Sequence, residues 1–440
     1  MSRRDDASIG DHARVPKTVV FFPEGAYGPT NNCIGIGQVL QERGYRVVFV
    51  LEESFAGNLE AQGFEERLMR LGPPPEVDEV PGQFWKDFIR DTAPVFRRPT
   101  IEQLAGFIEP TFRALYEGAV YVDDRLREIF AELEPAAIVE DNVAAFAAIR
   151  HSGRPWARIM SCNPLEAKDA GIPPVFSGLP FADRAGWDAF RAEYLRSTGE
   201  LHAEYAAFLA GRGAGELPAG DFMQESEYLN LYVYPAELDY PRGAPLAPTW
   251  HRLETCVRST TDSYEPPPGD GALVYLSLGS LASADVDLMR RLVDVLSTSP
   301  HRFVVSKGPQ ADAYELADNM TGEEYLPQPA ILPLVDLVIT HGGNNTTTEC
   351  LHFGKPMIVL PVFWDQYDNA QRVAETGFGV RLDTYAFEPA ELLSEVDRLL
   401  ADTALQARLG AISRRVQASP GTVRAADLIQ ELAETGRPVT

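Results

Sequence analysis

The stretch DLVITHGGNNTTTECLHFGKPMIVLP, residues 336–361, contains a complete strand–turn–helix–strand unit. DLVIT is a short apolar run, typical of a buried strand. TTTECLHF has the length of a short helix, and Gly354 and Pro356 follow it as stop signals. MIVLP predicts a second strand parallel to the first, because a helix connects the two. The turn before the helix carries almost no charge, although the chain as a whole is strongly acidic.

Short apolar strands alternate with helical patterns on both sides of this unit. The strand-like runs are TVVFF (18–22), RVVFVL (46–51), AAIVED (136–141) and ARIMSC (157–162), and then ALVYLSLGS (272–280), HRFVVS (301–306), DLVITHG (336–342) and MIVLP (357–361). Strands that alternate with helices form parallel sheets. The two series are separated by residues 240–271, which are rich in proline and glycine, as interdomain connections are. The sequence therefore predicts an α/β protein with two doubly wound parallel-sheet domains.

The breaks in this pattern also predict the extent of each part. The predicted parts are a disordered tail (1–16), a first domain (17–245), a second domain (246–420) and a C-terminal helix that packs back on the first domain (421–440). Residues 75–130 and 165–235 are aromatic and helical in pattern and interrupt the strand rhythm. Insertions of this kind usually build a pocket, and we expect this one to do so.

Composition excludes several classes of function. The chain has 440 residues, with 39 Lys and Arg against 64 Asp and Glu and a net charge of -25, which disfavours nucleic acids and anionic membranes as partners. No signal peptide and no apolar window of membrane-spanning length is present, so a cytoplasmic protein without membrane insertion is expected. The four cysteines lie far apart, and we expect no metal site. Both a monomer and a homodimer are compatible with this composition.

The turn at residues 341–345 has the properties of a phosphate site. It leads from the carboxyl end of a strand into a helix N-terminus, where free backbone amides and the helix dipole favour an anion. Glycines let a phosphate approach closely, so no basic side chain is needed. The alternative is that Gly342 and Gly343 only make a tight turn and that the threonines only cap the helix.

Other polar residues are expected at the same edge of the second sheet. They come from LSLGS (Gly279 and Ser280), EEYLPQPAIL (Tyr325 and Gln328) and PVFWDQYDNA (Asp365 and Gln366). Together with the turn they supply an aromatic ring for a base, a carboxylate for a ribose, donors for a diphosphate and an Asp–Gln pair for sugar hydroxyls. This set indicates a nucleotide-sugar site.

Three sequence blocks resemble the nucleotide-sugar signature of the family-one glycosyltransferases, which are UDP-sugar enzymes of the GT-B fold. In order and with matching spacing, the blocks are YLPQ, HGGNNTTTE and DQYDNA. The resemblance implies two Rossmann-like domains that face a cleft and a hexosyltransferase activity. It further implies that Tyr325 stacks on the base beside Gln328 and that Glu349 binds the ribose. The residues implied to hold the diphosphate are His341, Gly343, Asn345 and Thr346, with Gly279 and Ser280. Those implied to contact the sugar are Trp364, Asp365 and Gln366. Tyr325 replaces the tryptophan of the family pattern and Thr346 replaces its serine.

The catalytic base of the family is not matched. The resemblance implies an inverting, metal-independent transfer in which a histidine after the first strand activates the acceptor and an aspartate orients it. Asp141 matches that aspartate, but Pro29 stands where the histidine is expected. Three explanations stay open: Asp141 or Glu24 acts as the base, the acceptor is acidic enough to need little help, or the protein has lost activity. We favour the first two together.

Two other motifs have simpler interpretations. Gly35-x-Gly37 lies inside a predicted helix and lacks the third small residue of a dinucleotide fingerprint. Asp285-x-Asp287 opens a helix and is interpreted as a cap with dipole-favourable acids. For the acceptor, Phe84, Trp85 and Phe88 are candidates for the wall of a pocket, with Asn163 nearby. The alternative is that these aromatic residues form the small core of the insertion.

The predicted function is the transfer of glucose from UDP-glucose, with no other cofactor, to a small lipophilic natural product or xenobiotic. Abundant arginine and only five lysines suggest a bacterium with a GC-rich genome. A place in secondary metabolism is implied by the resemblance, because the family includes antibiotic-tailoring enzymes. The alternatives are a lipid- or cell-wall-precursor-directed transferase of the same fold and a catalytically silent nucleotide-binding partner protein.

Overall fold

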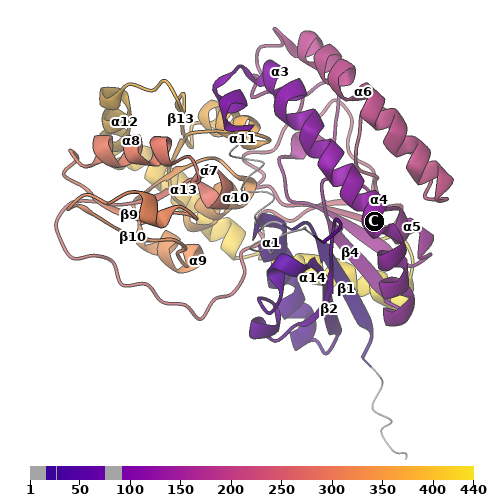
Figure 1. Cartoon of the computed structure of the whole chain (residues 1–440). Coiled ribbons are helices and arrows are strands. Elements are labelled where there is room, and N and C mark those ends of the chain that lie inside the picture. The colour runs from indigo at the N-terminus through magenta and orange to yellow at the C-terminus, as the bar shows by residue number, and fades with distance from the viewer. Residues whose placement is uncertain (1–15, 26, 75–91) are drawn as a thin grey trace, which may run out of the picture.

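The computed structural model describes residues 16–25, 27–74 and 92–440, and contains two parallel β-sheets in two lobes (Figure 1). The first sheet has the order β3-β2-β1-β4-β5-β6-β7. Its strands are β1 (Thr18–Pro23), β2 (Arg46–Glu52), β3 (Glu65–Met69), β4 (Ala137–Asp141), β5 (Trp156–Met160), β6 (Leu229–Tyr232) and β7 (Trp250–Arg252). The second sheet has the order β10-β9-β8-β11-β12-β13. Its strands are β8 (Leu273–Ser277), β9 (Arg302–Ser306), β10 (Met320–Glu323), β11 (Leu337–Thr340), β12 (Met357–Val359) and β13 (Gly379–Arg381).

The prediction of an α/β protein with two doubly wound parallel sheets is confirmed. Every strand pairing in the described residues is parallel. β7 pairs with β6, so the first sheet extends beyond residue 245, where the sequence places the domain boundary. The predicted tail lies outside the described residues except for Pro16.

The strands are apolar on both sides because helices cover both faces of the first sheet. Val19 and Phe21 of β1 face α1 (Tyr27–Glu42) and α14 (Gly421–Thr435), whereas Val20 and Phe22 face the opposite layer. That layer contains α4 (Glu109–Leu133), α5 (Ala147–His151) and α6 (Trp187–Gly211), as Figure 1 shows. A π-helical turn (Leu104–Ile108) joins α3 (Thr100–Gln103) to α4.

The second sheet is also flanked by helices. They are α7 (Gly279–Ala282), α8 (Val286–Leu296), α9 (Gln328–Ile331), α10 (Asn344–Phe353), α11 (Gln366–Thr376), α12 (Pro389–Ala401) and α13 (Thr403–Gln417). Asp285 caps α8, since its side chain accepts a hydrogen bond from the amide of Leu288 (3.1 Å), as the interpretation of Asp285-x-Asp287 requires. Gly35 and Gly37 lie in the interior of α1, away from its start. A Cβ at Gly37 would be 3.1 Å from the ring of Phe64, so this glycine allows close packing.

The chain crosses between the lobes twice, and the two crossings lie side by side. The outgoing segment, 253–272, leads from β7 to β8, and the return leads from α13 to α14 at residues 417–421. The amide of Gly421 donates a hydrogen bond to the carbonyl of Thr255 (3.2 Å). A Cβ at Gly421 would lie 2.0 Å from the carbonyl oxygen of Leu253, so only glycine fits where the crossings touch.

Each sheet has a topological switch point, where the order of its strands reverses. The order reverses between β1 and β4 in the first sheet and between β8 and β11 in the second. Open α/β sheets bind ligands outside the carboxyl ends of the strands at such points. A candidate site is therefore expected where these two edges meet.

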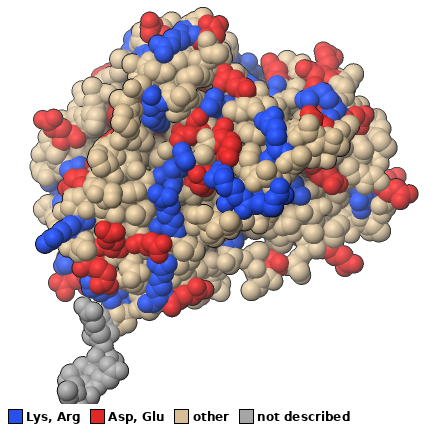
Figure 2. Space-filling view, turned by 180° about the vertical axis from the view of Figure 1, so that it is seen from behind, with Lys and Arg blue, Asp and Glu red and all other residues tan. Residues whose placement is uncertain are grey.

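The surface carries charges of both signs. Figure 2 shows acidic and basic side chains interspersed over the face seen from behind, without a broad area of one sign. Among the helices of the described ranges, none combines the length and apolar character needed to span a membrane.

Candidate functional site

Hydrogen bonds join the two sheet edges at their switch points. Asn345, in the first turn of α10, donates from Nδ2 to the carbonyl of Gly28 in α1 (2.8 Å). Its neighbour Asn344 donates from Nδ2 to the carbonyl of Val233, which follows β6 (3.0 Å). The N-terminus of α10 therefore lies at the junction of the lobes.

The N-terminus of α10 has no side-chain cap. Gly343 is the N-cap residue, and it offers no side chain to the first amides of the helix. The first turn of a helix has amides without intrahelical partners, and the dipole makes this end positive. The sequence predicts Asn345 as a phosphate ligand, but its side chain is bonded to the first lobe. The backbone amides and the glycines remain the part of the turn suited to an anion.

His341 is held between two glycines. A Cβ at Gly279 would lie 2.8 Å from the imidazole, and a Cβ at Gly343 would lie 2.5 Å from Nε2. Both residues must therefore be glycine for the ring to occupy this place. Burial lowers the pKa of His341 to about 4, and a hydrogen bond with the backbone of Ser277 opposes this shift only in part. The imidazole is thus neutral at pH 7 and has one N–H group, which donates either to the backbone of Ser277 or, once turned from it, to a ligand.

Gln328, Thr346 and Glu349 form one hydrogen-bonded cluster. Nε2 of Gln328 donates to Glu349 (2.5 Å) and to the hydroxyl of Thr346 (3.3 Å). Burial raises the pKa of Glu349, while the amide of Gln328 and the charge of Arg258 oppose that shift. Tyr325, three residues before Gln328, is 49% exposed. Gln328 and Glu349, predicted for the base and ribose, are thus brought together with Thr346, predicted for the diphosphate, and the charge of Arg258 from the interlobe segment acts on Glu349.

The residues predicted for the sugar lie at the lobe junction. Asp365 is buried and accepts a hydrogen bond from the amide of Asn163 in the first lobe (2.8 Å). Burial raises the pKa of Asp365 to about 7. Oε1 of Gln366 accepts hydrogen bonds from the amides of Val362 (3.0 Å) and Phe363 (3.2 Å), so this oxygen holds its own loop.

Trp364 has an unusual backbone conformation. Its φ is +57°, a left-handed value that a bulky residue rarely adopts, and such strain gathers at functional sites. The indole packs against Phe176 and Phe112 of the first lobe, with ring centroids 4.5 and 5.2 Å away. The ring therefore links the loop before α11 to the aromatic interior of the first lobe.

Asn163 requires a correction. The sequence predicts it as an acceptor-binding residue, but it is 0% exposed. Its Nδ2 donates to Tyr234 (3.2 Å) and Asn369 (2.8 Å), and its Oδ1 accepts from the amide of Leu165 (3.0 Å). Because its polar groups are all engaged within the protein, Asn163 joins the lobes and does not face an acceptor.

Three carboxyl groups, one buried and two half-buried, gather at the carboxyl edge of the first sheet. Burial raises the pKa of Glu24 to about 7 and raises the pKa of Asp141 well above its usual value. Asp141 is 2% exposed and accepts a hydrogen bond from the hydroxyl of Ser161. Glu166, in a 3-10 turn after β5 (Pro164–Glu166), lies close to both, since its charge contributes to both shifts. Neither Glu166 nor Ser161 is among the site residues predicted from the sequence.

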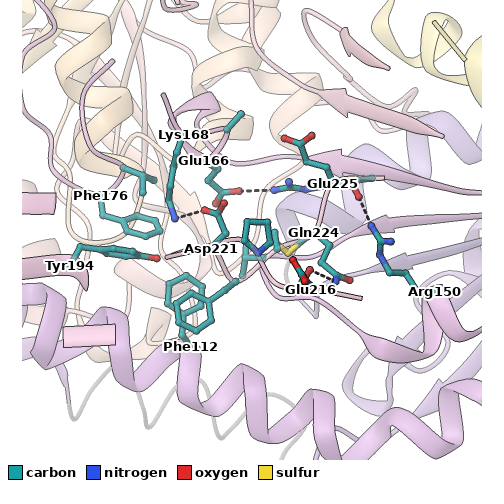
Figure 3. Close-up of a pocket in the computed structure, with 17 residues that line it drawn as sticks. Phe112, Arg150, Glu166, Lys168, Phe176, Tyr194, Glu216, Asp221, Gln224 and Glu225 are labelled. Atoms are coloured by element: carbon teal, nitrogen blue, oxygen red, sulfur yellow. Dashed lines mark hydrogen bonds and ion pairs between the residues drawn. The ribbon is translucent and has the colours of Figure 1, made fainter. Parts of the chain in front are cut away.

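A cavity of about 360 Å³ lies in the first lobe beside Glu166. Figure 3 shows the rings of Phe112, Phe176 and Tyr194 at one side and charged groups around the remainder. The charged groups form ion pairs, Lys168 with Asp221 and Arg158 with Glu166, the latter at 3.7 Å. The predicted acceptor residues Phe84, Trp85 and Phe88 lie outside the described residues. The cavity combines apolar rings with ionic side chains, so it suits a ligand with both characters.

Within residues 16–25, 27–74 and 92–440, no group of three or more His, Cys, Asp or Glu side chains is arranged to hold a metal ion.

The chain is similar to known proteins in sequence and in fold. Residues 254–420 match the family described as UDP-glucoronosyl and UDP-glucosyl transferase. The chain is 24% identical to the NDP-glycosyltransferase YjiC of Bacillus subtilis over 92% of this chain and 94% of that protein. It is 26% identical to the oleandomycin glycosyltransferase of Streptomyces antibioticus over 94% of this chain and 90% of that protein.

Solved structures share the fold. The glycosyltransferase of kitacinnamycin superposes with a TM-score of 0.69 at 22% identity, covering 94% of this chain and 99% of that one. The glycosyltransferase VinC, solved in complex with DTDP, has a TM-score of 0.62 at 18% identity and covers 95% of this chain and 99% of its own. Residues 254–420 thus match the UDP-glucoronosyl and UDP-glucosyl transferase family, and the similarities over the whole length show that the chain is a glycosyltransferase with the GT-B fold.

Proposed function

We propose that the protein transfers a sugar from a nucleoside diphosphate sugar to a hydroxyl group of a small natural product or xenobiotic. The observation that carries this proposal is the uncapped N-terminus of α10, with His341 held between Gly279 and Gly343 beside it. Named relatives that act on natural products, such as the oleandomycin enzyme, support the acceptor class.

The diphosphate is proposed to bind at the first turn of α10. Backbone amides and the helix dipole stabilise the charge that develops on the departing diphosphate, and a neutral His341 adds a hydrogen bond. Such donors are already oriented, so the transfer is proposed to need no metal. The acceptor attacks the anomeric carbon from the opposite side and inverts it. The Gln328–Glu349 cluster is proposed to bind the ribose, with Tyr325 against the base.

The donor is proposed to be UDP-glucose. Asp365, with one carboxylate oxygen bonded to Asn163, keeps acceptor capacity for sugar hydroxyls, which favours a hydroxylated sugar over a deoxysugar. Gly279 and Ser280 stand at the neighbouring strand end, after β8.

The cavity beside Glu166 is proposed as the acceptor pocket. Its aromatic wall suits an apolar ring system, and its ion pairs suit polar substituents on the same molecule. This extends the expectation of a lipophilic acceptor to an amphipathic one.

A calorimetric panel of UDP, dTDP and GDP, followed by mass spectrometry with UDP-glucose and mixed phenolic and alcohol acceptors, tests the proposal. Binding of UDP and a product heavier by one hexose are expected. Absence of nucleotide binding would refute the site at α10.

Pro29 keeps a second candidate open, a nucleotide-binding partner without activity of its own. Nucleotide binding with no product from any acceptor in the panel would favour that function.

A further inference from the structure

A chain of hydrogen bonds leads from Asp141 to the N-terminus of α10. Ser161, directly after β5, donates its hydroxyl to Asp141. Nδ2 of Asn32 in α1 donates to the hydroxyl oxygen of Ser161 (2.8 Å) and to Oδ1 of Asn345 in α10 (2.9 Å). Asn345 then donates to the carbonyl of Gly28, next to Pro29. The carboxylate in the first lobe is thus connected to the proposed diphosphate site in the second.

Ser161 is better placed than Asp141 to meet a substrate. Asp141 is 2% exposed, whereas Ser161 is 7% exposed and stands between Asp141 and the lobe junction. The hydroxyl of Ser161 uses its proton toward Asp141 and one lone pair toward Asn32. One lone pair remains, and a hydroxyl oxygen can accept two hydrogen bonds.

We propose that Ser161 is a catalytic residue that passes the acceptor's proton to Asp141, in place of the histidine absent at Pro29. This rests on the proposed transferase function. As the acceptor oxygen bonds to the anomeric carbon, its proton moves to Oγ of Ser161, and the proton of Ser161 moves to the carboxylate of Asp141. The bond from the anomeric carbon to the diphosphate oxygen breaks, and the nucleoside diphosphate leaves with the electron pair. The relay ends with a neutral Asp141 and a restored hydroxyl on Ser161.

The surroundings of Asp141 favour its role as the final proton acceptor. Burial and the neighbouring charges of Glu24, Glu140 and Glu166 raise its pKa, so the ionised carboxylate is a strong base. The other titratable groups near it are the thiols of Cys33, Cys162 and Cys256, whose pKa values are also raised. Glu24 is the neighbouring carboxylate that could compete for this role, and it follows β1, with its amide bonded to the carbonyl of Asp141 (2.9 Å).

The test compares Ser161→Ala with Ser161→Thr, which keeps a hydroxyl. The probes are UDP-glucose with 4-nitrobenzyl alcohol and with the more acidic 4-nitrophenol. We expect Ser161→Ala to lower kcat for the alcohol by about 10²-fold or more, with less effect on the phenol, and Ser161→Thr to restore part of the loss. Calorimetry should give the same UDP affinity for both variants as for wild type, which also checks that they fold.

The dependence of kcat on pH provides a second measurement, because it would not change if Ser161 and Asp141 had only a structural role. In wild type, kcat for the alcohol should rise with pH as Asp141 ionises, and Asp141→Asn should abolish this rise. Combining Asp141→Asn with Ser161→Ala should cost little beyond either change alone, because the two act as a unit. Glu24→Gln should keep the rise.

Two results would overturn the relay: wild-type turnover of the alcohol by Ser161→Ala, or loss of the pH-dependent rise in Glu24→Gln but not in Asp141→Asn. Failure of the proposed function is distinguishable, because wild type itself would then bind no UDP or form no product.

Discussion

Two glycines beside His341 determine where its imidazole lies and therefore its protonation state. Gly279 and Gly343 admit the ring into a buried place, and that burial keeps it neutral. A neutral imidazole has one N–H group, so it can stabilise a phosphate oxygen when that group turns from the backbone of Ser277 to the leaving diphosphate.

His341→Ala should lower turnover by about 10²–10³-fold, since one preorganised donor to the leaving group is lost. Steady-state kinetics with UDP-glucose measures this, and His151→Ala, which changes an exposed histidine, is the control. Equal turnover in the two variants would remove His341 from the diphosphate site.

Glu349→Ala should weaken UDP binding by about 10-fold or more, because a hydrogen bond to a charged group contributes about 1.5–3 kcal/mol. Isothermal calorimetry measures the change, with Glu431→Ala on the exposed side of α14 as the control. An unchanged affinity would contradict the ribose role.

Some residues of the site could be predicted from the sequence, and others could not. The motifs predicted that Gln328, Thr346 and Glu349 belong together, since they lie on one strand–helix unit and its neighbour. Nothing local could predict that Asn163 and Asn345 bond across the lobes, because those partners are 206 and 317 residues away in the chain.

Among the elements, the alternation of strands and helices was predictable because each parallel strand is an apolar run between helices. The cavity proposed for the acceptor was not predictable. Its aromatic rings come from α4, α6 and the loop that contains Phe176, and each ring is compatible with an ordinary core position in the sequence. Only the packing of these elements makes Phe112 and Phe176 a wall, with Trp364 behind them.

Helix α14 offers a test of how the last element is held. Ile429 is 0% exposed in the cluster formed with α1, so Ile429→Ala should lower the free energy of unfolding by about 2–4 kcal/mol. Denaturant unfolding measures this, and Val423→Ala, at a position that is 40% exposed, is the control. A change below that of the control would contradict the packing of α14.

For the whole molecule, buried acids govern the response to pH. Burial raises the pKa of Asp368 and Glu140 to about 8 and the pKa of Asp365 and Glu24 to about 7. In an unfolded chain these groups titrate near pH 4, so the folded state binds their protons more tightly. Their contribution to the free energy of unfolding is fully present below about pH 4 and is lost as the pH rises through their pKa values in the folded state.

His341 and His352, whose pKa values burial lowers to about 4, act in the opposite direction between about pH 4 and 6.5. The acids are therefore expected to dominate above about pH 6.5.

The melting temperature should fall between about pH 6.5 and 8, and Asp368→Asn should make this fall less steep. Asp368 accepts hydrogen bonds from the amides of Phe176 (2.6 Å) and Gly178 (2.8 Å), so it joins α11 to the first lobe. One group contributes at most about 1.4 kcal/mol per pH unit. Scanning calorimetry at several pH values measures the slope, with exposed Asp270→Asn as the control. Parallel slopes in wild type and Asp368→Asn would contradict the assignment.

The paired crossings at Leu253 and Gly421 have a mechanical consequence. Two adjacent covalent connections hold the lobes together at one place, so neither lobe can separate from the other when a single connection is cut. A protease that cuts the exposed peptide near residues 259–271 would therefore leave a nicked molecule in one piece, because α14 remains anchored on the opposite half.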